Sequence, residues 1–189
     1  MKWREFIGLA LLGLGMPASA VEVDPYSEPK IGDAKNFQDF FSQVAANVYV
    51  AGQPTEAALS AMRDKGVTRV ISLRTAREMD NREIVPFDEA AVVKDLGMDY
   101  VHIPLGGADT PYTAEALDRF ASAIETSEGG VLLHCTVAWR ASHMWAAYLV
   151  AHQGFSVADA VAYGQQMNMG GYPFAELLGR SVRLEAVSP

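Results

Sequence analysis

The segment HCTVAWRAS, residues 134–142, brings together two side chains that can carry out nucleophilic chemistry on an anion. Cys135 is the one cysteine of the 189-residue chain, and Arg140 follows it after four intervening residues. A cysteine thiolate is a strong nucleophile, and a planar guanidinium can hold two oxygens of a phosphate at once. The pair therefore indicates a site where sulfur attacks the central atom of an oxyanion held by arginine.

Cys135 lies where a predicted strand meets a predicted helix. Residues 130–135 (GVLLHC) are a short apolar run typical of a buried strand, and residues 140–152 carry apolar side chains at helical spacing. At such a junction, free backbone amides and the helix dipole stabilise an anion or a thiolate. We therefore expect a phosphate to be bound by Arg140 and by the loop residues Thr136, Val137, Ala138 and Trp139. The alternative is a cysteine that is simply buried.

Two further polar residues follow predicted strands and should reach the same edge of the sheet. Asp109, in GGADTPYT (106–113), is a candidate proton donor to a leaving group, or else a turn residue before a helix. Arg74 either adds a cation to the anion site or forms an ion pair, with Glu78 as the expected partner. The four histidines have no metal-ligand spacing, so we expect no metal and no other cofactor.

Strand and helix patterns alternate along most of the chain. This alternation predicts an α/β fold with a mainly parallel central sheet flanked by helices, and ligands in such sheets bind at the carboxyl ends of the strands. The expected strands are 47–52, 67–73, 99–105 and 130–135. The expected helices are 55–66, 87–96, 113–127, 140–152, 156–168 and about 173–182.

Several segments resemble the bacterial dual-specificity-like protein tyrosine phosphatases, including the beta-lactamase-hydrolase-like phosphatase domains. They are NVYVAGQP (47–54), GVTRVISLR (66–74), YVHIPL (100–105) and HCTVAWRAS (134–142), and the resemblance covers about 36–170. It implies a cysteine phosphatase-like fold and a cysteine-dependent phosphatase acting on phosphomonoesters. It further implies that Cys135 forms a phosphocysteine, that Arg140 stabilises the transition state, and that Asp109 protonates the leaving alcohol. The substrate would be a phosphoprotein or a phosphorylated small molecule.

The cysteine segment departs from the usual signature of this family in three places. Four residues rather than five separate Cys135 from Arg140, as in the subgroup that the other segments resemble. No glycine stands between them, with Ala138 near the middle, and the hydroxyl expected directly after the arginine is Ser142, one place later. Two alternatives therefore remain: a non-catalytic oxyanion-binding pseudo-phosphatase, and a rhodanese-like sulfur transferase.

The N-terminus has the pattern of a cleaved secretory signal. Lys2 and Arg4 precede an apolar run, and small residues end at Ala20. We expect a signal peptide over 1–20, an extended lead-in over 21–35 and a single phosphatase-like domain over 36–189, exported to the periplasm or secreted. An uncleaved membrane anchor is the alternative. The net charge of −8 argues against nucleic acid as a partner.

Overall fold

A six-stranded sheet forms the centre of the protein, for which a computed structural model describes residues 28–171 and 173–182. The strands are β1 (Lys30–Ile31), β2 (Phe41–Ala45), β3 (Val48–Ala51), β4 (Val67–Ser72), β5 (Asp99–His102) and β6 (Gly130–His134). Their order across the sheet is β1-β2-β3-β6-β4-β5. The neighbours β3, β6, β4 and β5 run parallel, while β1 and β2 pair antiparallel at one edge. The predicted mainly parallel α/β fold is thus confirmed.

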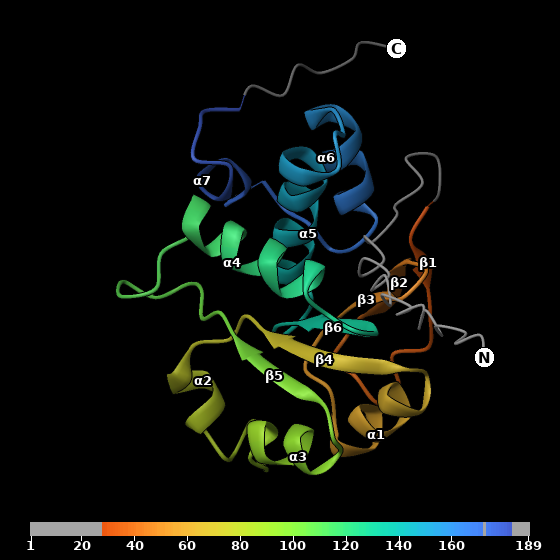
Figure 1. Cartoon of the computed structure of the whole chain (residues 1–189). Coiled ribbons are helices and arrows are strands. Elements are labelled where there is room, and N and C mark those ends of the chain that lie inside the picture. Colours follow the sequence, from red (N-terminus) through yellow and green to blue (C-terminus); the bar gives the residue numbers. More distant parts are fainter. Residues whose placement is uncertain (1–27, 172, 183–189) are drawn as a thin grey trace, which may run out of the picture.

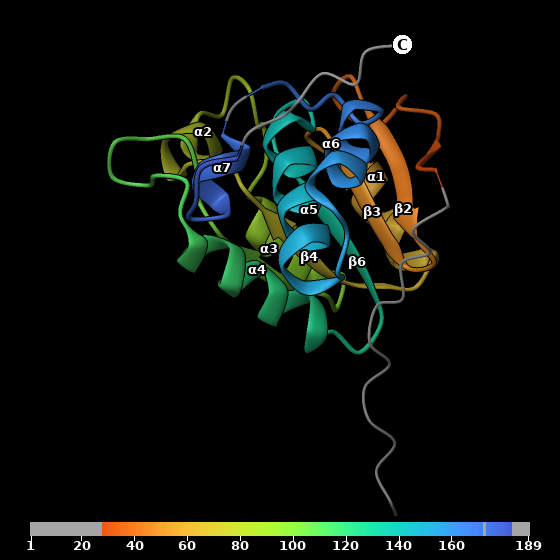
Figure 2. The same cartoon turned by 90° about the horizontal axis from the view of Figure 1, so that it is seen from above.

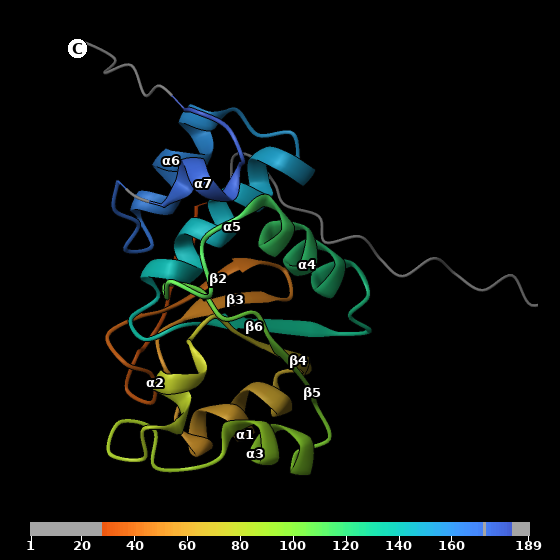
Figure 3. The ribbon, with the colours of Figure 1, turned by 90° about the vertical axis from the view of Figure 1, so that its left-hand side faces the viewer.

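Helices cover both faces of the sheet (Figure 1, Figure 3). On one side lie α1 (Glu56–Asp64), α2 (Ala76–Asp80) and α3 (Glu89–Asp95). On the other lie α4 (Ala114–Glu125), α5 (Trp139–His152), α6 (Val157–Gln165) and α7 (Phe174–Leu177). Successive strand residues face opposite layers: in β6, Val131 and Leu133 join the core under α5, whereas Leu132 joins the core over α1.

Most predicted elements are present, with shorter ends. Thr55 caps α1 by accepting a hydrogen bond from the amide of Ala58 at 3.1 Å, and Gly66 ends this segment with a φ of +88°. The sequence analysis did not predict β1, β2 or α2, and the strand expected over 99–105 ends at His102. The proposed signal peptide, 1–20, lies outside the described residues.

The helix α5 is buried around its whole circumference between residues 141 and 149, instead of along a single apolar stripe. Figure 2 shows why: α5 lies between α4 and α6 and runs over the sheet. The burial of α5 fixes the start of the helix, and hence the cysteine loop that precedes it.

None of the helices in the described ranges is long and apolar enough to span a bilayer.

His143 is a polar exception within α5. Its side chain is fully buried, and neither ring nitrogen has a hydrogen-bond partner in the described structure. The imidazole packs edge-on against Trp139, with 4.7 Å between the ring centroids. Burial lowers the pKa of His143 to about 4, because the charged form cannot be solvated there.

We predict that protonation of His143 destabilises the protein in mild acid. The unfolded chain takes up this proton near pH 6.5, whereas the folded protein does not until about pH 4. Stability should therefore fall by about 2 kcal/mol between pH 7 and pH 5 from this residue alone. In His143→Leu this loss should be absent, as measured by urea unfolding at both pH values. Parallel pH profiles for the two proteins would contradict the prediction.

Candidate active site

The cysteine loop joins β6 to α5 and is attached to the neighbouring strand β3. Cys135 directly follows β6, and its free thiol belongs to a buried residue. Its amide donates to the carbonyl oxygen of Ala51 at 3.3 Å, and the carbonyl oxygen of Thr136 accepts from the amide of Gln53 at 2.8 Å. The predicted order of strand, cysteine, loop and helix is therefore present, at the carboxyl end of a parallel strand.

Ala138 adopts a left-handed conformation, with φ 65° and ψ −8°, as the last residue before α5. An L-residue pays about 1–2 kcal/mol for this conformation, so the loop is held by contacts rather than by a glycine. The hydroxyl of Ser142 donates to the carbonyl oxygen of Ala138 at 2.9 Å and also contacts that of Met167. The side-chain amide of Asn168 donates to the carbonyl oxygen of Val137 at 2.8 Å. Ser142 thus supports the backbone of the loop.

Arg140 projects from the first turn of α5 to the ends of two neighbouring strands. Its Nη1 donates to the carbonyl oxygens of Leu105 at 2.8 Å and of Leu73 at 3.3 Å. The guanidinium also meets Glu78 in a two-pronged pair, Nη1 to Oε2 at 2.8 Å and Nη2 to Oε1 at 2.6 Å. Nη2 donates further to the hydroxyl of Thr136 at 2.9 Å. Burial acts to lower the pKa of Arg140, but the hydrogen bonds and charge of Glu78, together with the negative charge that Cys135 and Tyr112 can carry, raise it overall.

Glu78 is the carboxylate at the centre of the site. It is the third residue of α2 and forms a reciprocal cap with Thr75, whose amide and hydroxyl donate to Oε2 at 2.8 and 2.9 Å. The hydroxyl of Thr136 donates to Oε1 at 3.0 Å. Although burial acts to raise it, the hydrogen bonds from Arg140 and Thr75 and the charge of Arg140 lower the pKa of Glu78 to about 2. Glu78 is thus ionised at neutral pH and has no proton to donate.

A second chain of polar side chains, all of them buried, lies behind the loop. Arg74 is 1% exposed, and its Nη1 donates to Oε1 of Gln53 at 2.7 Å. Nε2 of Gln53 donates to Glu89 at 2.5 Å, and Glu89 meets Nε2 of His134 at 2.9 Å. Burial acts to raise the pKa of Glu89, but His134 and Gln53 lower it overall. Since Nδ1 of His134 lies 3.4 Å from the carbonyl oxygen of Cys135, this chain braces the loop.

Arg74 also lies beside Glu78, with 3.8 Å between its Nε and Oε1 of the carboxylate. The ion pair that the sequence suggested for Arg74 is therefore present. The guanidinium of Arg74 is buried next to Glu78. The contact of Arg74 with phosphate that the sequence suggested therefore stays a prediction. Sequence reasoning missed Glu78 as a partner of Arg140 and missed Glu89 entirely. The spacing of Thr75 and Glu78, which form a capping box, was the available signal that a helix begins here with Glu78 in its first turn.

Asp109 lies at the exposed tip of a tight turn. The amide of Thr110 donates to the carbonyl oxygen of Gly107 at 3.1 Å, and that of Gly106 donates to the carbonyl oxygen of Thr110 at 2.9 Å. The pocket around Arg140, about 570 Å³ in volume, is lined by Trp139, Glu78, Gly106 and Tyr112 among others, but not by Asp109. The role of Asp109 as the acid stays a prediction. In the described ranges, no group of three or more metal-ligating side chains is found.

The sequence from residue 31 to residue 177 matches the family model PTP-NADK, described as DSP-PTPase phosphatase fused to NAD+ kinase. The chain belongs to this family. The predicted resemblance to dual-specificity-like protein tyrosine phosphatases is thereby confirmed. None of the curated proteins matches the sequence.

Solved structures of phosphatase-like proteins have the same fold. A DUF442 protein from Shewanella putrefaciens CN-32, named as a candidate phosphatase, is 27% identical over 75% of this chain and 88% of its own, with a TM-score of 0.56. TpbA from P. aeruginosa, in a cysteine-to-serine variant in complex with pTyr, is 23% identical over 79% of this chain and 78% of its own, with a TM-score of 0.53. The second likeness bears on the fold alone.

We predict that Glu78 stabilises the folded protein through its charge. Glu78→Gln should unfold about 1–3 kcal/mol more easily at pH 7, because Arg140 and Arg74 lose their counter-charge. Since the pKa of Glu78 is lowered to about 2, this difference should persist above pH 5 and be roughly halved by pH 3. Chemical denaturation across this pH range measures it, with the exposed Glu83→Gln as the control. A difference that does not depend on pH would contradict the electrostatic origin.

Proposed function

We propose that this chain is a phosphomonoesterase that works through a cysteinyl phosphate. The observation that carries the proposal is the two-pronged bond of Arg140 to a carboxylate beside the cysteine loop. A guanidinium that holds two carboxylate oxygens in this way can hold two phosphate oxygens by the same geometry. Membership of a phosphatase family and a free cysteine directly after β6 support the same conclusion.

The proposed reaction has two steps. The sulfur of Cys135, as thiolate, attacks phosphorus, a bond to sulfur forms, and the bond from phosphorus to the ester oxygen breaks. The leaving oxygen takes a proton from a general acid, for which Asp109 is our candidate and ionised Glu78 is not. Water then attacks the cysteinyl phosphate, which releases inorganic phosphate and restores the thiolate. Arg140 and the loop amides hold the equatorial oxygens, where negative charge develops.

The proposed substrates are phosphorylated protein side chains or phosphorylated small molecules. In the part of the chain that the structure describes, the two Nη groups of Arg140 already donate to the side chains of Glu78 and Thr136 and to the carbonyl oxygens of Leu73 and Leu105. An incoming phosphate must therefore share these donors or displace the carboxylate. The loop without a glycine, in which Ala138 is left-handed, favours a second candidate function, a non-catalytic module that binds oxyanions without turnover.

Hydrolysis of para-nitrophenyl phosphate under reducing conditions tests the proposal. Cys135→Ser should lower kcat by at least about 10³-fold, because the nucleophile is lost, and Arg140→Lys by about 10²-fold or more, because one charge cannot replace the fork. Arg63→Lys, on the exposed surface of α1, is the matched control and should keep full activity. Phosphate trapped on Cys135 after rapid quenching would identify the intermediate. Turnover that survives Cys135→Ser would reject the mechanism, and phosphate binding without turnover would establish the binding module.

The acid is tested separately, by Asp109→Asn. We expect kcat to fall by about 10²-fold, and by more for phenyl phosphate, whose leaving group needs the proton more. Asp95→Asn, at the end of α3, is the control. An unchanged rate for phenyl phosphate would remove Asp109 from the mechanism. A rhodanese-like sulfur transferase would be indicated instead if the protein transferred sulfur from thiosulfate to cyanide and ignored both phosphate esters.

A further inference from the structure

Tyr112 brings a hydroxyl group into the pocket around Arg140, and the proposed mechanism does not use it. The residue lines this pocket together with Arg140 and Gly106. Within the described lining, the other hydroxyl belongs to Thr75, which donates to Oε2 of Glu78 at 2.9 Å. The hydroxyl of Tyr112 is therefore the one to consider as a further donor to a bound anion.

The surroundings of Gly106 show how close the hydroxyl of Tyr112 comes to Arg140. A Cβ atom on Gly106 would lie 3.1 Å from Oη of Tyr112 and 3.6 Å from Nη1 of Arg140. The phenol oxygen and the guanidinium therefore border the same small space beside Gly106. The φ of this residue, +102°, also favours glycine. Glycine thus serves both the turn of the backbone and the approach of these two side chains.

The backbone is fixed on both sides of Tyr112. Before it, the turn at 106–110 is closed by the amide of Gly106, which donates to the carbonyl oxygen of Thr110 at 2.9 Å. After it, Thr113 caps α4 by accepting from the amide of Ala116 at 3.2 Å. The half-buried ring of Tyr112 packs against the core under α5. Its hydroxyl is therefore presented to the pocket from a braced segment rather than from a loop tip.

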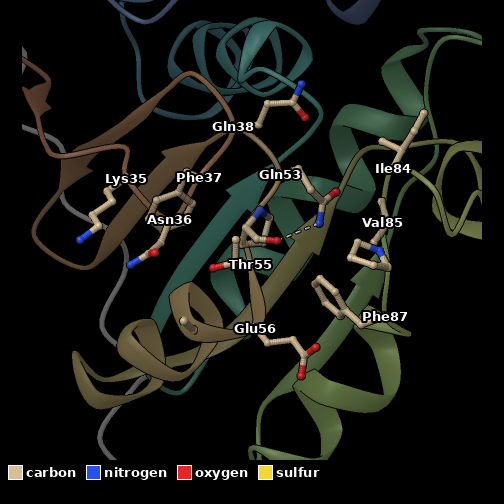
Figure 4. Close-up of a pocket in the computed structure, with 13 residues that line it drawn as sticks. Lys35, Asn36, Phe37, Gln38, Gln53, Thr55, Glu56, Ile84, Val85 and Phe87 are labelled. Atoms are coloured by element: carbon tan, nitrogen blue, oxygen red, sulfur yellow. Dashed lines mark hydrogen bonds between the residues drawn. The ribbon is translucent and has the colours of Figure 1, made fainter.

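The pocket on the other side of Ile84 offers no comparable place for an oxyanion (Figure 4). Its volume is about 500 Å³, and Ile84 lines both pockets. Among its described lining residues the one cation is Lys35, and Figure 4 shows this amino group at the edge, directed away from Gln53. The side-chain amide of Gln53 is already bonded within the fold. An oxyanion is therefore expected beside Arg140 and Tyr112.

We infer that the hydroxyl of Tyr112 donates a hydrogen bond to the oxyanion held by Arg140, and that Tyr112 is a catalytic residue of the phosphoryl transfer. The inference rests on the proposed function and adds a donor to its site. Arg140 and the loop amides reach the phosphoryl group from α5 and the loop before it, whereas Tyr112 reaches it from the segment before α4. The phenol keeps its proton throughout, so the proton for the leaving oxygen is still assigned to Asp109. As negative charge grows on the phosphoryl oxygens, a donor already in place stabilises it.

Binding of orthovanadate tests this role without turnover. Orthovanadate is tetrahedral like phosphate and accepts a fifth ligand, so it resembles the phosphoryl group in the transition state. Tyr112→Phe keeps the ring and removes only the hydroxyl. We expect it to bind vanadate about 10- to 100-fold more weakly in calorimetric titrations, which is the effect of one hydrogen bond to a charged acceptor. The value of kcat/KM for para-nitrophenyl phosphate should fall by a similar factor.

Tyr49→Phe is the matched control, because Tyr49 lies in β3 and outside the pocket around Arg140. It removes the same group and should change vanadate affinity and kcat/KM by less than about twofold. Urea unfolding checks that both variants are folded under the conditions of the titration. Inorganic phosphate, titrated in the same way, reports whether the hydroxyl also contacts the ground-state oxyanion.

The outcomes separate this inference from the proposed function. Equal vanadate affinities for Tyr112→Phe and Tyr49→Phe would overturn the inference, even if kcat/KM differed, and so would a lack of vanadate binding by the unaltered protein. If the unaltered protein binds vanadate but does not hydrolyse para-nitrophenyl phosphate, the phosphatase proposal fails. In that case a loss of affinity confined to Tyr112→Phe still supports the hydroxyl as an oxyanion donor.

Discussion

The ion pair between Arg140 and Glu78 is the interaction on which the candidate site depends. Arg140 lies at the N-terminus of α5. Its guanidinium donates hydrogen bonds to carbonyl oxygens that follow β4 and β5, and to a carboxylate from α2. One guanidinium thereby joins three neighbouring strand ends and helices from both faces of the sheet. Thr136 adds the cysteine loop to the same cluster. The shape of the site is therefore set by charge pairing as much as by the apolar core.

The buried charges behind the loop follow the same physical rule. Arg74 and Glu89 are both nearly inaccessible to water, and an unpaired ion in such a position is strongly unfavourable. The side chain of Gln53 separates them, accepting from Arg74 with its oxygen and donating to Glu89 with its nitrogen. His134 completes the chain at the cysteine. Truncation of any one member would leave another buried polar group without its partner.

The sequence predicted the parallel part of the fold well, because buried strands such as 67–73 and helix stops such as Gly66 are local signals. It did not predict β2, because the residues FSQVA neither alternate regularly nor form a long apolar run. The pairing of Arg140 with Glu78 could not be predicted, since they are 62 positions apart and only the folded sheet brings these two side chains together at the ends of its strands. The left-handed Ala138 shows a similar limit: the absence of glycine from the loop was visible, but the contacts from Ser142 and Asn168 that hold it depend on the tertiary fold.

The single, buried cysteine has a consequence for redox chemistry. Cysteine sulfur that is oxidised to a sulfenic acid is commonly rescued by a second thiol, which captures it as a disulfide before further oxidation. The chain contains one cysteine, so no resolving thiol exists within it. Burial of Cys135 limits the access of oxidants to the sulfur. Once the sulfur is oxidised, recovery of the thiol depends on a reductant from outside the chain.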